Sequence, residues 1–509
     1  MHNIGQNIKV RSIPWLRPPT VPKDEKIASS DMNKRLELLS EFLYYVFDSI
    51  LIPLIRSHFH VTESNMHRNQ LFFFRHDIWQ KLAEPSLRSL RTKNFEELPH
   101  GTAKAMFSSR AFGFTPLRLM PKRNGMRPIT NLRRRPLVKQ NGKLLLGSSI
   151  NATLTPVFSM LNYEKRVRKQ TVGSGLFSVG EMHGRLKDFK STVASQGSNK
   201  LYFVKADVQT CFDSIPQHEL IQVVRRIIKN HQYLVRKHAE VRAPDVRWAG
   251  HSAVPYRKFI ATAAPVNNYS IGPGEQFRMP SGRRGTVIVD TGYQKLHDAR
   301  RLLKLLEEHV NGNVVKIGKQ YYRQKRGIPQ GSILSSLLCN LFYGCYESAS
   351  LGFLQEDSML LRLIDDFLLI TPNPSHARRF LQIMADGSER FGITTNPAKS
   401  LVNFEVTING AKVPRLPDGD AFPYCGMLID TSSLEVTKDH RREGEWVQNG
   451  LSIEINRTPG KTFGRRVLNL FKVQMHAMVV DSRLNSLDLL GTLTVGRELD
   501  PRAAEDKAD

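Results

Sequence analysis

Cysteines and long apolar runs are both scarce in this sequence. It has four cysteines, and no two of them are spaced as Cys-x-x-Cys, so we expect reduced thiols, no structural zinc and an intracellular protein. A membrane-spanning helix needs about 18 consecutive apolar residues, and the best candidate, Phe42 to Ile55, is shorter and is interrupted by Asp48 and Pro53. The N-terminus also lacks the basic and then apolar pattern of a secretory signal. These absences predict a protein with no membrane partner.

Acidic residues are few relative to basic ones. The 47 Asp and Glu residues are outnumbered by 74 Lys and Arg residues, which gives a formal net charge of +27. Such a surplus suits a polyanionic partner such as DNA or RNA, although a charge that only keeps a protein soluble would have the same composition. The 509 residues, of which 40% are apolar, are enough for about two to four domains with sizeable cores.

The pattern along the chain changes several times. Residues 12–26 are rich in Pro and charge and predict a linker, and apolar residues at helical spacing after Ser30 predict a small helical core. Leu117 to Ile129 and Leu201 to Ala206 have the pattern of strands. From Lys229 to Tyr321 the pattern weakens to loop-rich stretches with one helix near 296–310, which we interpret as an insertion. Residues 491–509 predict a frayed tail.

Two adjacent carboxylates, Asp365 and Asp366, lie between two apolar, strand-like runs. Neighbouring like charges in such a place repel each other and lose hydration unless a cation neutralises them, and a divalent metal would do so. Because consecutive side chains on a strand point to opposite faces, both carboxylates can serve one site only if the pair lies at a hairpin turn. The sequence therefore predicts a metal-binding hairpin here.

A third carboxylate, Asp207, ends the strand-like run Leu201 to Ala206. Three carboxylates on neighbouring strands can hold two Mg²⁺ ions about 4 Å apart, one activating a primer 3′-hydroxyl and one steadying the leaving pyrophosphate. On its own, Asp207 would also fit a turn or a cap. Asp213 is better explained as a helix cap or a structural pair. Phe212, five residues after Asp207, is either a core aromatic or a ring that excludes a ribonucleotide's 2′-hydroxyl.

Two further segments have the composition of substrate-binding loops. Gln330 lies in a Gly-flanked loop that leads into an apolar helix, so the loop is free to approach a base or a sugar. Lys122 and Arg127 flank the turn at Gly125, where both could grip a triphosphate. A solvated basic turn explains the same spacing equally well.

Taken in order, these blocks resemble the motifs of the telomerase reverse transcriptase family from about Trp15 to Ser486. Seven segments of the chain each resemble one family motif. They are Leu71 to Leu82 for the T motif, Leu117 to Asn131 for motif 1, Phe203 to Pro216 for motif A, Gly327 to Glu347 for motif B′, Leu361 to Pro372 for motif C, Asn396 to Phe404 for motif D and Phe422 to Thr431 for motif E.

The resemblance implies roles for individual residues. It makes the three aspartates catalytic ligands of two Mg²⁺ ions. Residues that would bind the incoming dNTP are Lys122, Arg127, Phe212, Gln330, Gly331 and, near the pyrophosphate, Lys399. The primer grip would be Tyr424, Cys425 and Gly426, and the RNA-binding residues of the T motif would be Phe73, Phe74, Arg75 and Trp79. Without the resemblance, Lys399 would be interpreted as a surface residue.

The resemblance also implies an architecture: an α+β, right-hand polymerase with palm, fingers carrying an insertion, and a partial thumb, preceded by a helical part of the telomerase RNA-binding domain. The boundaries we expect are 1–100 for the RNA-binding part, 101–200 for the fingers, 201–435 for the palm with the insertion at about 229–320, and 436–509 for the partial thumb and tail. The partners it implies are telomerase RNA, the single-stranded telomeric DNA 3′ end, dNTPs and other holoenzyme proteins, in the nucleus at chromosome telomeres.

Two alternatives remain from the sequence. A mobile-element or intron-encoded reverse transcriptase would have no T motif and a short gap between motifs A and B′, whereas here 120 positions (327 − 207) separate them. The second alternative is a non-catalytic RNA- or DNA-binding fragment. Only residues 1–70 precede the T motif and the pattern stops after Leu490, so we expect a chain truncated at both ends.

Overall fold

The computed structural model describes residues 10, 13–16, 28–64, 70–122, 125–140, 142–196, 200–242, 256–266, 285–354, 357–395, 397–439, 459–474 and 477–490. The chain divides into two compact units. The first comprises residues 1–88, 119–127 and 442–473, and the second comprises 89–118, 128–441 and 474–509. The predicted tail, most of the predicted linker and the Gly-rich stretches between 267 and 284 lie outside the described residues.

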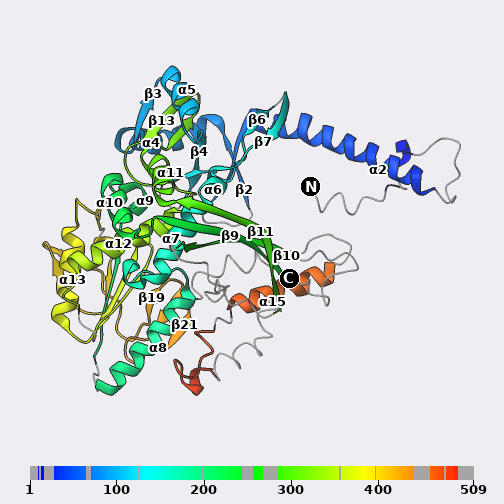
Figure 1. Ribbon diagram of the computed structural model, residues 1–509. Helices are drawn as coiled ribbons and strands as arrows, with labels where there is room; N and C mark the ends of the chain where they lie inside the picture. Colours follow the sequence, from blue (N-terminus) through cyan, green and yellow to red (C-terminus); the bar gives the residue numbers. More distant parts are fainter. Residues whose placement is uncertain are drawn as a thin grey trace. The chain divides into compact units, whose positions relative to one another are not determined.

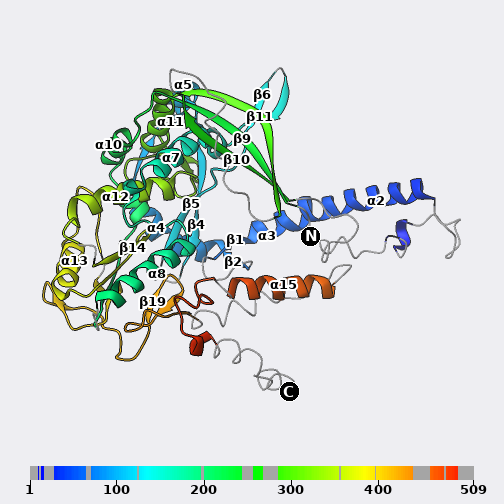
Figure 2. The ribbon, with the colours of Figure 1, turned by 60° about the horizontal axis from the view of Figure 1, so that its bottom comes forward.

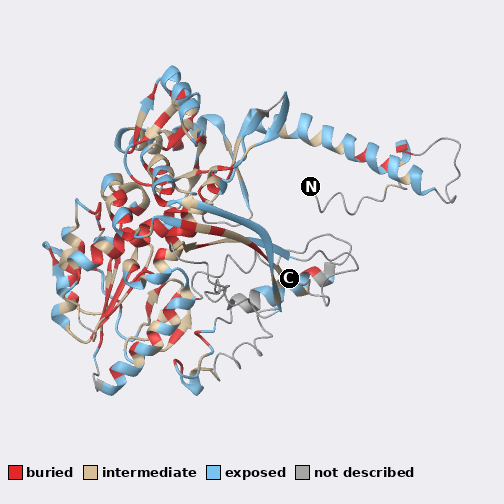
Figure 3. Cartoon of the chain, in the orientation of Figure 1, coloured by how far each residue is buried: buried red, intermediate tan, exposed pale blue. Residues whose placement is uncertain are grey.

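A long exposed helix begins the first unit (Figure 1). It consists of α2 (Ser29–Tyr44), the π-helical η3 (Tyr45–Leu51) and α3 (Ile52–His58). The predicted helix is therefore present, but the predicted small core is wrong, because Leu36 and Phe42 are exposed and only Leu39 among the apolar positions is buried. Figure 3 shows α2 as almost entirely exposed.

The same helix bears on the membrane prediction. Pro53 lies in the interior of this continuous helix, just after the π-helical η3, and it does not end the helix. Ser29–His58 is consequently 30 residues long and, by length and composition alone, apolar enough to cross a membrane. Our expectation that this segment is too short is wrong, although one helix of this kind is weak evidence for a membrane.

A hairpin and a helix complete the described core of the first unit. Strands β1 (Phe59–Glu63) and β2 (Leu71–Arg75) pair antiparallel, and α4 (His76–Lys93) follows directly. The His60 ring stacks on the Trp79 ring with centroids 3.9 Å apart, and the tilted Phe74 ring lies with its centroid 5.4 Å from that of Trp79. Helix α15 (Pro459–Gln474) also belongs largely to this unit.

A four-stranded antiparallel sheet lies at the centre of the second unit, in the order β14 (Met359–Leu363), β15 (Asp366–Thr371), β8 (Tyr202–Asp207) and β16 (Leu401–Val402). Its side chains alternate between two apolar clusters. Phe367 and Leu369 enter one cluster, and Leu368 and Ile370 enter the other. The sheet is therefore covered on both faces, which makes its ends the places where polar side chains can reach solvent.

Helices cover one face, and a helix with a small sheet covers the other. The first cluster includes residues of α7 (Thr155–Val167), α10 (Gln217–Ile227), α12 (Ser335–Ser350) and α13 (Pro374–Asp386). The second includes residues of α8 (Val179–Gln196) and of the sheet β19 (Phe422–Tyr424), β20 (Met427–Ile429) and β21 (Val436–Lys438). In Figure 2 α12, α13 and β14 can be followed together, and Figure 3 shows that buried residues concentrate around α12.

The predicted insertion contains regular structure that the sequence pattern did not indicate. Strands β9 (Gln232–Arg242), β10 (Tyr256–Pro265) and β11 (Thr286–Asp298) form an antiparallel sheet with β9 in the middle, drawn in green in Figure 1. Helix α11 (Ala299–Asn311) follows and matches the predicted helix. The sequence pattern missed this sheet because β11 is exposed almost throughout and so lacks an alternating apolar face.

The remaining elements are shorter. A five-stranded sheet has the order β3-β13-β12-β4-β5, in which β12 pairs parallel with β4 at Val315 and Thr115. The bounds are η2 (Pro14–Leu16), β3 (Phe95–Leu98), α5 (His100–Ser109), β4 (Thr115–Pro121), β5 (Met126–Thr130), β6 (Leu137–Gln140), β7 (Lys143–Leu146), α6 (Ile150–Thr153), η4 (Lys169–Val172), α9 (Cys211–Ser214), β12 (Val314–Ile317), β13 (Gln320–Gln324), η5 (Pro397–Lys399), β17 (Thr407–Ile408) and β18 (Ala411–Lys412).

Candidate active site

Asp207 and Asp366 lie side by side at one end of the central sheet. They are register partners in the antiparallel pair β8 and β15. Directly opposite residues of such a pair have Cα atoms about 4.5–5.5 Å apart. The next backbone bond, from the Val208 amide to the Asp365 carbonyl at 3.1 Å, ties the third aspartate to the same place. The backbone thus places all three aspartates that the sequence singled out at the same end of the sheet.

A two-residue turn presents Asp365. Leu363 pairs with Asp366, so Ile364 and Asp365 form the loop of the hairpin between β14 and β15. The backbone of Ile364 has φ +62°, in the left-handed region that a β-branched residue rarely adopts. The two adjacent aspartates lie at a hairpin turn, as their spacing required, and both are half-buried.

An ammonium group neutralises part of this negative charge. Lys399, at the end of η5, places its Nζ 3.1 Å from Oδ2 of Asp207. The Lys399 side chain is 61% exposed, whereas that of Asp207 is 20% exposed, so the lysine reaches in from the solvent side. Among the described residues, no three His, Cys, Asp or Glu side chains are already gathered as a metal-binding group. The oxygen-only set at this turn nevertheless has the donor chemistry that Mg²⁺ prefers.

The Gly-flanked loop packs closely against the segment after Asp207. A Cβ on Gly327 would lie 2.5 Å from the Phe212 carbonyl, and Gly327 has φ +79°, so glycine is required there. The Ile328 amide donates to the same Phe212 carbonyl at 2.7 Å. The Phe212 ring is partly buried against the main core. The loop and the Asp207 segment are therefore fixed relative to each other.

Gln330 is held at both its backbone and its side chain. Its Nε2 donates to Oδ2 of Asp213 at 3.0 Å, and its carbonyl accepts from the Thr130 amide at 3.1 Å. Asp213 is thus half of a structural pair, which was one of the two roles expected of it. Gly331 (φ +112°) lies so close that a Cβ there would be 2.2 Å from the Thr130 carbonyl. Sequence reasoning missed Thr130, because nothing in the sequence links it to a loop 200 residues away.

The turn formed by Tyr424, Cys425 and Gly426 contacts the aspartate hairpin through Tyr424. The Tyr424 hydroxyl donates to the backbone carbonyl of Asp366 at 3.0 Å. Cys425 and Gly426 both have positive φ and close the hairpin between β19 and β20. Burial, and then the nearby Asp366 carboxylate, raises the pKa of the Cys425 thiol to about 12, so it is a neutral packing residue rather than a nucleophile.

The other predicted residues belong to the first unit. Lys122 and Arg127 are exposed on either side of the Gly125 turn, where the Lys122 amide donates to the Gly125 carbonyl at 3.1 Å. Their place beside a nucleotide stays a prediction. Of the T-motif residues, Phe73 and Arg75 are exposed, while Phe74 and Trp79 are half-buried in the His60 cluster.

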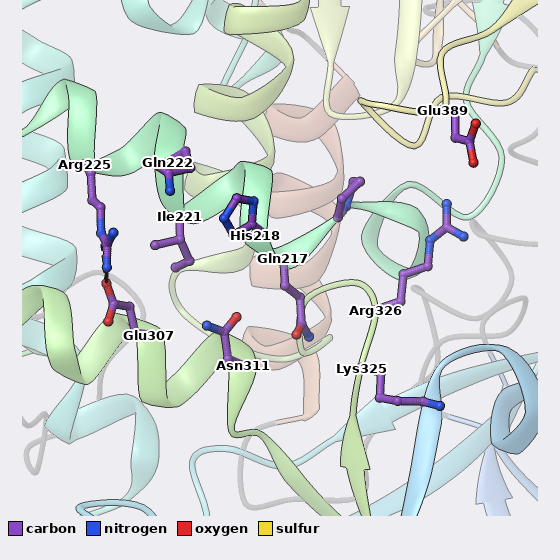
Figure 4. A pocket seen from close by; sticks show the side chains of 11 residues that line it. Gln217, His218, Ile221, Gln222, Arg225, Glu307, Asn311, Lys325, Arg326 and Glu389 are labelled. Carbon is purple, nitrogen blue, oxygen red and sulfur yellow. Dashed lines mark hydrogen bonds and ion pairs between the residues drawn. The ribbon is translucent and has the colours of Figure 1, made fainter.

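A separate depression of about 640 Å³ opens beside the N-terminus of α10 (Figure 4). Basic side chains from two segments line it, namely Arg225 of α10 and the adjacent Lys325 and Arg326, but Arg225 is paired with Glu307 and Arg326 donates to the Ser214 carbonyl. None of the three aspartates lines this depression. It is therefore distinct from the candidate site.

Two family descriptions match the chain. The telomerase ribonucleoprotein complex RNA-binding domain matches residues 1–90, and the reverse transcriptase (RNA-dependent DNA polymerase) family matches residues 288–426, which include Gln330, Asp365 and Asp366. The second match, together with the covered sheet and its three carboxylates, defines the class: the second unit carries a reverse transcriptase domain.

Similar proteins narrow the class further. Telomerase reverse transcriptase of Mus musculus is 32% identical over 94% of this chain and 43% of its own length, and that of Oryzias latipes is 30% identical over 94% and 44%. The chain thus spans less than half the length of these curated relatives. A structure of telomerase from Candida albicans with a fragment of telomeric RNA covers 97% of the chain with a TM-score of 0.64 at 19% identity, which shows the shared fold. Along nearly its whole length, the chain is a relative of the telomerase reverse transcriptases.

Proposed function

We propose that this chain is an RNA-directed DNA polymerase of the telomerase type, which extends a DNA 3′ end with dNTPs on a bound RNA template. The observation that carries the proposal is the meeting of Asp207, Asp365 and Asp366 at one end of the sheet. Reverse transcriptases use divalent metal ions; Asp207, Asp365 and Asp366 would hold them here, and the ions would supply activation of the 3′-hydroxyl and stabilisation of the leaving pyrophosphate.

Residues around the carboxylates have defined tasks in this proposal. The Asp366 carbonyl is fixed by Tyr424, so the primer 3′ end would meet a rigid hairpin. Phe212 and Gln330 would face the sugar and base of the dNTP from a loop fixed by Gly327 and Gly331. Lys399 would exchange its pairing with Asp207 for the leaving phosphate, where its Nζ proton can be donated.

The first unit would hold the RNA. Exposed Phe73 would offer a ring for base stacking, and exposed Arg75, whose guanidinium is paired with Asp77 at 2.9 Å, would exchange that partner for a phosphate of the RNA backbone. Telomeric DNA, telomerase RNA and other holoenzyme proteins are the partners that follow, in the nucleus at chromosome ends. The domain boundaries given under Sequence analysis, from the RNA-binding part at 1–100 to the thumb at 436–509, belong to the same proposal.

A primer-extension experiment tests this function. Wild-type chain supplied with telomerase RNA should add dNTPs to a single-stranded telomeric DNA primer, and prior digestion of the RNA should abolish the addition. Asp365→Ala should remove incorporation, while Asp188→Asn, which changes an exposed carboxylate of α8, should not. A chain that binds RNA and primer yet adds no nucleotide would instead be the non-catalytic binding fragment.

A further inference from the structure

Arg362 is a charged residue in a place that favours apolar side chains. It lies in β14 between Leu361 and Leu363, three residues before Asp365, and its side chain has no exposure to solvent. Across the hairpin it pairs with Phe367. A buried charge costs several kcal/mol unless it is paired and hydrogen-bonded, so its surroundings must supply many contacts.

All five N–H groups of its guanidinium have an acceptor. The Nε donates to Oε1 of Glu347 at 2.5 Å, and Nη2 donates to the carbonyls of Val172 at 2.9 Å and Asn340 at 3.2 Å. The Nη1 donates to Oδ1 of Asn340 at 2.7 Å and to the carbonyl of Ile364 at 3.5 Å. An ammonium has three donors and no planar fork, so lysine cannot reproduce this set.

The carboxylate partner is equally enclosed. Glu347 in α12 accepts from the Ser174 amide at 2.6 Å and from the Ser174 hydroxyl at 2.8 Å. A Cβ on Gly173 would lie 2.1 Å from Oε2 of Glu347, so the backbone after η4 passes so close to this carboxylate that no side chain fits between them. The Arg362 amide also donates to the Ser174 carbonyl at 3.2 Å. One arginine thus joins three segments that are far apart in the sequence.

The contact with Ile364 links this group to the catalytic turn. Ile364 is the first residue of the two-residue turn and has φ +62°. A β-branched residue persists in that conformation only where its surroundings hold it. The Arg362 side chain approaches the Ile364 carbonyl from the core side, one residue before Asp365.

We infer that Arg362 is a positioning residue for nucleotidyl transfer: with Glu347 and Asn340 it holds the strained Ile364 turn so that Asp365 and Asp366 face Asp207. This inference rests on the proposed function, because it assigns Arg362 a role in that same site. It predicts that loss of the guanidinium fork loosens the turn even where the core stays folded.

Two conservative substitutions test the inference. In Arg362→Lys and Glu347→Gln, kcat for single-nucleotide incorporation should fall by roughly ten- to hundredfold, since small misplacements at a reacting centre have effects of that size. The KM for the dNTP should stay within about threefold, because binding contacts are untouched. Hydrogen exchange of the backbone at residues 363–367 should speed up. The matched control is Arg390→Lys, which makes the same change at an exposed pair with Glu219 and should alter neither quantity.

A double substitution separates positioning from stability. Arg362→Met with Glu347→Leu removes both buried charges, and such apolar replacements often restore stability. Positioning predicts a recovered Tm with kcat still reduced and exchange at 363–367 still fast. Recovery of wild-type kcat, or loss of Tm in Arg362→Lys without a fall in kcat, would overturn the inference. A wild-type chain that adds no nucleotide would overturn the proposed function instead, and the exchange measurements would then decide the inference alone.

Discussion

At the scale of single residues, charged pairs hold two separate parts of the second unit. Lys399 pairs with Asp207 beside the aspartate hairpin. Near the end of the described chain, the Asp481 carboxylate pairs with two side chains of α8. Its Oδ2 lies 2.8 Å from His183 Nε2 and 3.3 Å from Lys187 Nζ. The first pair is expected to act in the reaction and the second in stability, so they call for different measurements.

Replacing Lys399 should slow incorporation without weakening primer binding. In Lys399→Ala, Asp207 loses its ammonium partner and the leaving pyrophosphate loses a proton donor, so we expect kcat to fall by roughly a hundredfold or more. Lys399→Arg keeps the charge but is a poor proton donor and should recover only part of the rate. Single-turnover incorporation checks this, and an unchanged rate in Lys399→Ala would contradict the assigned role.

Asp481 should make stability depend on acid pH. The Arg483 amide, and then His183 and Lys187, lower the pKa of Asp481 from its ordinary 3.8 to about 2. A lowered folded-state pKa gives stability that is fully present above pH 3.8 and is lost as the pH falls towards 2. Urea unfolding of wild type and Asp481→Asn should therefore differ at pH 6 and converge only below about pH 2. A difference that stays constant over this range would contradict the assignment.

At the scale of elements, close backbone approaches fix the loop that carries Gln330. The Gly331 position has φ +112° and no room for a Cβ beside Thr130. Gly184, within helix α8, has nothing within 4 Å of its Cβ position. Position 331 requires glycine because a Cβ would collide there, whereas position 184 has room for a Cβ. Alanine should therefore have opposite effects on stability at the two positions.

The free energy of unfolding should therefore fall in Gly331→Ala and rise in Gly184→Ala. We expect a loss of about 1–3 kcal/mol at 331, from backbone strain and a collision with the Thr130 carbonyl. Alanine in the helix should add about 0.5–1 kcal/mol. Chemical denaturation measures both. Equal effects at the two positions would mean that the loop is free to move away from Thr130.

Elements with an apolar face could be predicted from the sequence, and exposed ones could not. The strand leading to Asp207 and the hairpin at Asp365 followed from apolar runs ending in carboxylates. The sheet of β9 to β11 was missed, because the exposed β11 carries polar residues at successive positions. Arg362 was not singled out from the sequence, although a charge within an apolar strand is a signal for a buried partner, and its partner in α12 could not have been identified from spacing.

At the scale of the whole molecule, the net charge of +27 predicts binding that depends on salt. A basic surface that releases counterions from RNA gives an association constant that falls linearly, on logarithmic axes, with salt concentration. The two compact units each contribute basic residues, and the T-motif residues of the first unit offer a way to separate charge from stacking.

Two substitutions in the T motif should separate these contributions. Arg75→Gln should make the logarithmic salt slope shallower by about 0.7, the value for one phosphate of a single strand. Phe73→Ala should weaken binding by about 1–3 kcal/mol at every salt concentration, with the slope unchanged. Filter binding of telomerase RNA across a salt series checks both, and a slope change in Phe73→Ala would contradict the stacking role.

The central claim is that Asp207, Asp365 and Asp366 form one metal-dependent site for nucleotidyl transfer. Its most direct test is the rate of adding a single dNTP to a DNA primer annealed to RNA, measured against Mg²⁺ concentration for wild type and for Asp207→Asn, Asp365→Asn and Asp366→Asn. We predict Mg²⁺-dependent addition by the wild type, a fall of about a thousandfold or more in each variant, and unchanged duplex binding. Addition at the wild-type rate by any one of the three variants would contradict the account.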